Sequence, residues 1–329
     1  MKVLVTGATG FLGSHLVDRL LAQGDEVHVL TRKTSNLRWL KDKPVIYHEG
    51  DVTGTFDNIL KAVSGVDLVF HVAGIIQALH EDSYFKANAF GTKQILDACM
   101  QNKNIKRIVI VTSLAAHGPG RDMTTLARET DPCYPVNPYG ASKLEAEKIA
   151  SEYMSRLPIT IIRPPAIYGP RDEQFLSLFK MVSSGIVFLP GMSKKIINAS
   201  FVGDIVSGMI LASQHPAAIG ETFFIGDSQN YSWEEAAQVF AKVLKKNIII
   251  IPLPSPLVYA AACVADLISH VTGKLLPLNW DNVTNFIQKN WMMDISKAQK
   301  ILEYQPQMSL EKGIETTYQY LLETNTLKK

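Results

Sequence analysis

The sequence predicts an α/β fold: a doubly wound parallel sheet of the Rossmann type with a smaller C-terminal lobe. A glycine-rich turn follows the first apolar segment, short apolar runs alternate with helical segments up to residue 163, and 47% of the 329 residues are hydrophobic. Strands that alternate with helices imply right-handed crossovers and a parallel sheet. A chain of this size can bury a large core, as one long α/β domain or as two.

The elements of the first half follow from this alternation. Strands are expected at residues 3–6, 26–31, 45–50, 66–71, 107–113 and 159–163, because each is a short run of mostly apolar residues. The intervening segments at 13–22, 57–63, 84–102 and 139–155 are expected to be helices. Residues 1–168 therefore form a predicted dinucleotide-binding domain, to which residues 197–226 return through a strand at 199–204 and a helix to 212.

The alternation breaks up after Pro164 and Pro165, which indicates a substrate lobe at 169–196 and 227–329 over the carboxyl ends of the strands. Helices are expected at 175–184, 296–302 and 310–322, and a strand at 248–251. Ser232 and Glu235 have capping-box spacing, so a helix is expected at 232–244.

The longest apolar stretch, residues 256–271, contains Asp266 and His270 and is shorter than the roughly 18–20 apolar residues of a spanning helix. We expect a buried helix there and no spanning segment; contact with an apolar substrate or a membrane surface is the alternative.

Composition argues against several classes of protein. The net charge of +2 comes without a basic stripe, so nucleic acid is not an expected partner. Cys99, Cys133 and Cys263 are odd in number and lack metal-ligand spacing, which predicts neither a disulfide framework nor a metal site. Because Met1 and Lys2 lead directly into a strand, no signal peptide is expected, and the prediction is a cytoplasmic protein.

The glycine-rich turn is the predicted cofactor site. Gly7, Gly10 and Gly13 follow a strand and open a helix, the context in which this pattern indicates dinucleotide binding. Side chains at the first two positions would obstruct the turn and the approach of the pyrophosphate. Phe11 and Leu12 belong to the same site, because a helix N-terminus offers free N–H groups to phosphate.

The end of the second strand favours NADP over NAD. NAD-binding sites place a carboxylate there for the ribose 2′-hydroxyl, but this chain has Thr31, Arg32 and Lys33. Arg32 can pair with a 2′-phosphate. NAD stays possible, since the two basic residues could instead form a solvated loop.

Tyr139 and Lys143 are the candidate acid–base pair. Residues four apart share a helix face, so both side chains would reach one small volume beside the cofactor. A neighbouring ammonium and an oxidised nicotinamide would lower the pKa of the phenol toward the working range.

These motifs resemble the extended short-chain dehydrogenase/reductases, which include nucleotide-sugar epimerases and dehydratases and 3β-hydroxysteroid dehydrogenase-like enzymes. The resemblance covers nearly the whole chain, and the matching segments occur in order. They are residues 6–13, 50–52, 71–74, Asn88 with 91–92, 111–113, 139–143, 163–170 and 304–306.

The resemblance implies a role for each matching residue. Asp51 would accept from the adenine amino group with Val52 beside the ring, Ala73 would line the cofactor path, and Asn88 would hold the active-site helix. Ser113 would bind the substrate oxygen, Tyr139 would exchange its proton, and Lys143 would hold the nicotinamide ribose. The backbone from Pro164 to Ile167 would face the nicotinamide amide. Relatives also pair the helices at 84–102 and 139–155 across a two-fold axis, so a homodimer is expected.

Two departures from the family pattern bear on the substrate. Many nucleotide-sugar enzymes have Asn where this chain has Ala166, and the dehydratases carry an acidic pair where Leu114 and Ala115 follow Ser113. The prediction is hydride transfer between NAD(P) and an apolar alcohol or ketone. Alternatives are a nucleotide-sugar 4-epimerase that retains its cofactor and a non-catalytic dinucleotide-binding protein. Possible pocket residues are Phe175, Leu176, Phe179, Phe188, Leu257, Tyr259 and Trp280. His117 is expected to be packed in its loop, with a proton relay as the alternative.

Overall fold

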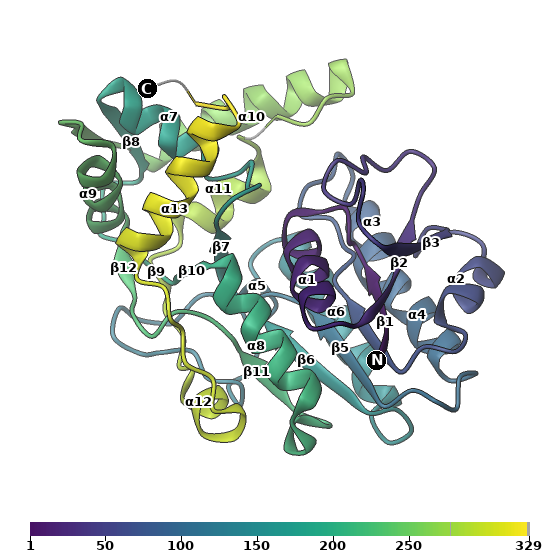
Figure 1. Ribbon diagram of the computed structural model, residues 1–329. Helices are drawn as coiled ribbons and strands as arrows, with labels where there is room; N and C mark the ends of the chain where they lie inside the picture. The colour runs from purple at the N-terminus through teal and green to yellow at the C-terminus, as the bar shows by residue number, and fades with distance from the viewer. Residues whose placement is uncertain (277, 328–329) are drawn as a thin grey trace.

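The computed structural model describes residues 1–276 and 278–327 and contains a seven-stranded sheet in the order β11-β6-β5-β4-β1-β2-β3 (Figure 1). Every neighbouring pair in this sheet is parallel. Its strands are β1 (Lys2–Thr6), β2 (Glu26–Thr31), β3 (Val45–Glu49), β4 (Leu68–His71), β5 (Arg107–Val111), β6 (Ile159–Arg163) and β11 (Thr222–Phe224). The predicted doubly wound Rossmann fold is confirmed, and the strand order reverses between β1 and β4, where such sheets bind ligands.

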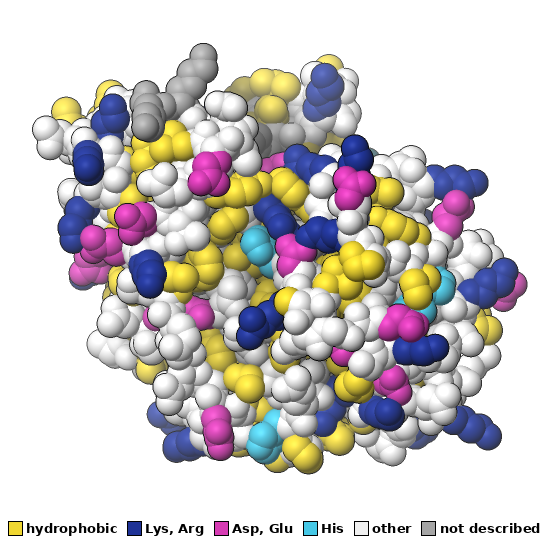
Figure 2. Space-filling view, viewed as in Figure 1, with side chains coloured by type: hydrophobic (Ala, Val, Ile, Leu, Met, Phe, Trp, Pro, Cys, Tyr) yellow, Lys and Arg dark blue, Asp and Glu magenta, His cyan; other side chains and the backbone are white. Residues whose placement is uncertain are grey.

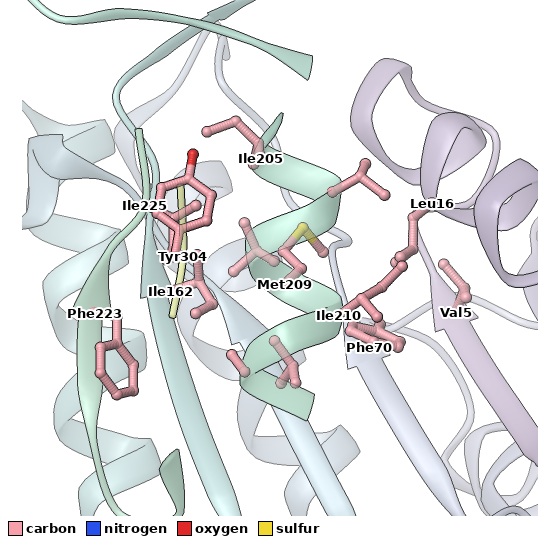
Figure 3. Packing of buried hydrophobic residues seen from close by; sticks show 14 of the residues in the cluster. Val5, Leu16, Phe70, Ile162, Ile205, Met209, Ile210, Phe223, Ile225 and Tyr304 are labelled. Carbon is pink, nitrogen blue, oxygen red and sulfur yellow. The ribbon is translucent and has the colours of Figure 1, made fainter. Parts of the chain in front are cut away.

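Helices cover both faces of the sheet. On one face, α1 (Phe11–Ala22) and α8 (Val202–Gln214) pack on alternate strand residues such as Val3 and Val5. On the other face, α2 (Phe56–Val63), α4 (Gly91–Cys99) and α6 (Pro138–Tyr153) bury the side chains between them, such as Leu4. Figure 3 shows Met209 and Ile210 of α8 among side chains of the sheet and of α1.

The helix predicted at 84–102 is divided into three parts. A short α3 (Glu81–Tyr84) continues into a π-helical segment, η1 (Phe85–Phe90), and then into α4. Such π segments add a residue to a turn and frequently lie at functional sites. Here the π segment contains Asn88.

The strand predicted at 199–204 is shorter than expected and lies outside the main sheet. β10 (Ala199–Phe201) pairs with β7 (Ala166–Tyr168) in a separate two-stranded sheet. The chain returns through α8 and β11, which pairs with β6.

The second lobe packs around its own apolar core. Its elements are α7 (Leu176–Ser184), β8 (Ile186–Pro190), β9 (Ile196–Ile197), β12 (Tyr231–Ser232), α9 (Trp233–Leu244), β13 (Ile249–Leu253), α10 (Ser255–Thr272), α11 (Trp280–Ile287), β14 (Asn290–Trp291) and α13 (Leu310–Glu323). The capping box of Ser232 and Glu235 is present at the start of α9, as predicted.

Two short helices accompany the main sheet. η2 (Pro216–Ala218) precedes β11, and α12 (Ser296–Leu302), placed in the second lobe by the sequence, packs on the core of the main sheet through Ala298 and Leu302.

The expectation that residues 256–271 form a buried helix is wrong. Only 22% of α10 is buried, and its buried residues are Val258, Ala262, Ala265 and Ser269. Among the described residues, α10 is the one helix that is long and apolar enough to cross a membrane. Hydrophobicity alone predicted burial, but the neighbouring α11 is only eight residues long and covers one narrow stripe of α10.

Candidate functional site

The glycine turn after β1 is packed too tightly for side chains. A Cβ on Gly13 would lie 2.2 Å from the Gly7 carbonyl oxygen, and one on Gly7, whose φ is +72°, would lie 2.7 Å from the Ala73 nitrogen. The turn therefore touches the end of β4 at the point where the strand order reverses. Gly10 precedes α1 and has no side chain to cap it, so the backbone N–H groups of Phe11 and Leu12 at the start of this helix can serve a phosphate.

Arg32 and Asp51 lie at the ends of the next two strands, beside this turn. Arg32 Nη1 is 4.0 Å from Asp51 Oδ2, and both side chains are partly exposed. Asp51 Oδ1 accepts hydrogen bonds from the backbone and the hydroxyl of Thr53, at 2.8 and 3.0 Å. Val52 packs against Gly91, where a Cβ would lie 2.9 Å from a Val52 methyl.

Ser113 and Tyr139 are brought together by two helix N-termini. Ser113 caps the short α5 (Leu114–His117) by accepting from the Ala115 nitrogen at 3.0 Å. Asn137 caps α6 by accepting from the Gly140 nitrogen at 2.9 Å, which puts Tyr139 in the first turn. Burial raises the pKa of Tyr139, and a hydrogen bond with Ser113 acts in the opposite direction. From the sequence we expected a lowered pKa for Tyr139, because we counted the charge of a bound oxidised nicotinamide. In the protein without cofactor, burial has the largest effect and raises this pKa.

Lys143 lies one turn further along α6 and is buried. Its Nζ donates to the Val111 carbonyl at 3.1 Å. Burial lowers the pKa of Lys143 to about 8, and the nearby Glu147 carboxylate opposes this shift. A Cβ on Gly74 would lie 2.7 Å from Asn88 Oδ1 and 2.8 Å from Lys143 Nζ, so a side chain here would displace one of these two groups.

Asn88 connects the π segment to the catalytic helix. Its Oδ1 accepts from the Ile75 nitrogen at 2.9 Å, and its Nδ2 donates to the Ile75 carbonyl at 3.1 Å and to the Ser142 hydroxyl at 2.9 Å. Asn88 thus holds the strand-end loop against α6, directly beside Lys143.

Pro164 and Ile167 close the same edge of the sheet. The Pro164 carbonyl accepts from the Leu114 nitrogen at 2.8 Å, which ties the chain after β6 to the segment that carries Ser113. Ile167 is the middle residue of β7 and pairs with Ser200 of β10.

A buried ion pair beneath these residues was not predicted. Glu147 accepts from Arg163 Nε at 2.9 Å, from Arg163 Nη2 at 2.5 Å and from the Thr112 hydroxyl at 2.6 Å. It links α6 to the residues that directly precede Ser113 and Pro164. The signal was available in the sequence, because Tyr139, Lys143 and Glu147 are spaced four apart on one helix face.

The second lobe reaches the site through α11. Tyr84 donates to Asp281 Oδ2 at 2.9 Å, and Asn137 donates to the Asp281 carbonyl at 3.1 Å. The rings of Tyr84 and Tyr139 are 6.3 Å apart. Asp281 is therefore a link between the lobes that the sequence analysis missed.

His117 is buried, as expected of a packed side chain, but it is the last residue of α5 and does not lie in a loop. Its Nδ1 lies 2.9 Å from the Gly118 carbonyl oxygen, and its ring meets Phe224 edge-on at 5.7 Å. Burial lowers its pKa, so the ring is neutral at physiological pH.

The proposed pocket residues lie in different surroundings. Phe179 is core, whereas Phe188 and Leu257 are exposed. Tyr259 and Trp280 pack on each other, with ring centroids 4.7 Å apart, where α10 meets α11.

Comparison with known proteins agrees with this geometry. Residues 3–226 match the model of the NAD dependent epimerase/dehydratase family. The chain is 27% identical to a sterol-4-alpha-carboxylate 3-dehydrogenase of Saccharomyces cerevisiae, with 97% of each chain covered. It is 26% identical to a UDP-glucose 4-epimerase of Vibrio cholerae, with 98% of this chain and 96% of the relative covered. A UDP-glucuronic acid 4-epimerase of Bacillus cereus, solved with NAD, shares the fold with a TM-score of 0.80 at 23% identity, over 98% of this chain and all of that one.

Proposed function

The chain belongs to the NAD-dependent epimerase/dehydratase family of extended short-chain dehydrogenase/reductases, and we propose that within it the protein is a 3β-hydroxysteroid dehydrogenase-like oxidoreductase. It transfers hydride between NAD(P) and an apolar alcohol or ketone. The observation that carries this proposal is the convergence of Ser113, Tyr139 and Lys143 without a carboxylate after Ser113, where Leu114 and Ala115 are buried.

Each residue has its own role in the proposed reaction. The dinucleotide, when bound, accepts or supplies the hydride. The Ser113 hydroxyl orients the substrate oxygen, and Tyr139 takes or gives the proton at its Oη. Lys143 holds the ribose and, while charged, stabilises the phenolate. Asn88 and Glu147 position α6 beneath them.

The turn formed by Gly7, Gly10 and Gly13 fits a dinucleotide pyrophosphate, because its glycines allow a tight turn and the first N–H groups of α1 have no side-chain cap. NADP is the proposed cofactor. Arg32 is exposed and 4.0 Å from Asp51, so its guanidinium can swing to a 2′-phosphate. Structural neighbours solved with NAD keep NAD as the alternative.

The second candidate is a nucleotide-sugar 4-epimerase, which the Vibrio cholerae relative favours. Ala166 in place of the family's Asn argues against it. An epimerase oxidises and re-reduces one substrate, so it keeps its cofactor; a dehydrogenase exchanges it.

One set of measurements separates the two. Purified protein is denatured and its released dinucleotide is quantified, and fresh protein is offered either a sterol-like ketone with NADPH or a UDP-hexose. Oxidation of NADPH by the ketone supports the dehydrogenase. If the purified protein retains its cofactor and interconverts UDP-hexoses, it is an epimerase and the dehydrogenase proposal is wrong.

A further inference from the structure

Helix α10 has an apolar face that the rest of the described chain leaves uncovered. Surface helices of globular proteins normally turn polar side chains outward. Here the outward residues are between 46% and 79% exposed, and they form what we call the α10 face: Leu257, Val264, Leu267, Ile268 and Val271. Figure 2 shows hydrophobic side chains at the top of the molecule, where Figure 1 places α10. An apolar surface of this kind marks an interaction site.

The polar groups of this helix serve the lobe itself. Asp266 Oδ2 accepts from the Trp280 nitrogen at 3.0 Å, and the Ser269 hydroxyl accepts from the Leu276 nitrogen at 3.2 Å. These bonds, together with the packing of Val258 and Ala262 on Val283 of α11, fix α10 along the lobe surface. Both ends of α10 lead back into the same lobe. The helix can therefore lie along an apolar medium but is not placed to cross it.

Lys274 is exposed and follows the α10 face directly. Asp266 and Asp281 are partly buried and accept hydrogen bonds. The exposed carboxylates nearest in sequence to a contact with α10 are Glu81 and Asp82, which follow His80 on α3 at the His270 end of the helix. Lys274 is therefore the group at this face that can pair with an anionic lipid headgroup.

The size of the face argues against a second copy of the chain as its cover. A helix of 18 residues is about 27 Å long and about 10 Å wide. It offers roughly 300 Å², well below the roughly 800 Å² that each partner contributes to a stable interface. A bilayer surface requires neither a minimum area of this kind nor complementary hydrogen bonds.

We propose that the α10 face attaches the protein to the surface of a lipid bilayer that contains anionic lipid, with the helix axis in the membrane plane. The attachment stands apart from the proposed reaction, but it gives that reaction a route for substrate. The His270 ring on α10 is 5.8 Å from His80, and Tyr84, whose hydroxyl accepts from Ala78 at 3.1 Å, lies beside Tyr139. A series of contacts through residues 78–84 thus connects the carboxyl end of α10 to Tyr139, and this is the side from which an apolar substrate would arrive from the membrane.

Flotation of the full chain with vesicles tests the proposal independently of catalysis. The vesicles are phosphatidylcholine alone or phosphatidylcholine mixed with phosphatidylglycerol. The double variant Leu267→Glu/Ile268→Glu is compared with Ile219→Glu. Ile219 has the same 46% exposure as Ile268 but lies before β11, at the amino-terminal edge of the parallel sheet. Thermal melting verifies that each variant is folded.

We expect the wild type to float with the anionic vesicles, the double variant to bind at least about tenfold more weakly, and Ile219→Glu to bind as the wild type does. Lys274→Ala lowers binding to anionic vesicles by about fivefold, since one lysine near such a surface contributes that factor. A wild type that binds neither vesicle overturns the proposal, as does equal loss in the double variant and Ile219→Glu. If light scattering reports a dimer that dissociates in the double variant, and no vesicle binding is seen, the α10 face is an interface with a second copy of the chain instead.

Discussion

Replacing Glu147 by Gln removes the charge that balances a buried guanidinium. The side chains of Glu147 and Arg163 are each 6% exposed, and the carboxylate receives two hydrogen bonds from Arg163 and one from Thr112. Gln keeps the shape but presents an NH₂ donor to one of the arginine donors. Breaking a buried pair in this way costs about 3–5 kcal/mol. Because the amide oxygen still accepts, we expect about 3 kcal/mol, or a Tm lower by roughly 4 °C for a chain of 329 residues.

Glu145→Gln is the matched control on the same helix. Glu145 forms an exposed pair with Lys148 at 3.2 Å, and such pairs contribute less than about 1 kcal/mol. Denaturant unfolding and differential scanning calorimetry on both variants measure the difference. If Glu147→Gln melts within about 1 °C of Glu145→Gln, the ion pair does not stabilise the active-site end of α6 and the reasoning is refuted.

The same substitution has a catalytic consequence. Glu147 opposes the burial that lowers the pKa of Lys143, so its removal lowers that pKa further below about 8. A lysine is charged below its pKa, so in Glu147→Gln the activity should begin to fall at a lower pH than in the wild type. If the activity falls at the same pH in both proteins, Glu147 stabilises the fold without affecting the charge of Lys143.

Four other outcomes follow from the same site. Tyr139→Phe leaves cofactor affinity within a few fold but lowers turnover by at least about 100-fold, and near-normal turnover would contradict the acid–base role. In the wild type, kcat/KM for the cofactor falls as pH rises through about 8, because Lys143 loses its charge. In Lys143→Arg the side chain stays charged, so kcat/KM does not fall in this pH range. NADP binds more tightly than NAD, and Arg32→Ala removes the difference; equal titration curves for the two cofactors in the wild type exclude this role. Light scattering reports a dimer of the 36.4 kDa chain, and Phe90→Glu, at an exposed position on the π segment, shifts it to monomer; a wild-type monomer refutes the pairing.

Local patterns in the sequence were enough to predict the strands of the sheet and the candidate site residues. β2, β6 and α12 have the predicted bounds, because runs of β-branched residues and apolar periodicity are local properties that burial in a doubly wound sheet reinforces. The turn of Gly7 and Gly13 and the spacing of Tyr139 and Lys143 are equally local, since a tight turn and a helix face are defined within a few residues.

Which charged groups pair with one another, and which apolar surfaces stay exposed, depend on packing between distant elements. Glu147 and Arg163 are 16 residues apart on different elements, and their pairing depends on how α6 crosses the sheet. The π segment that directs Asn88 toward Ser142 depends on contacts with the loop at Ile75. The apolar stretch of α10 has the composition of a core helix, but a side chain is buried only where a neighbour covers it. The short α11 covers one stripe, so the rest of that hydrophobic surface faces outward.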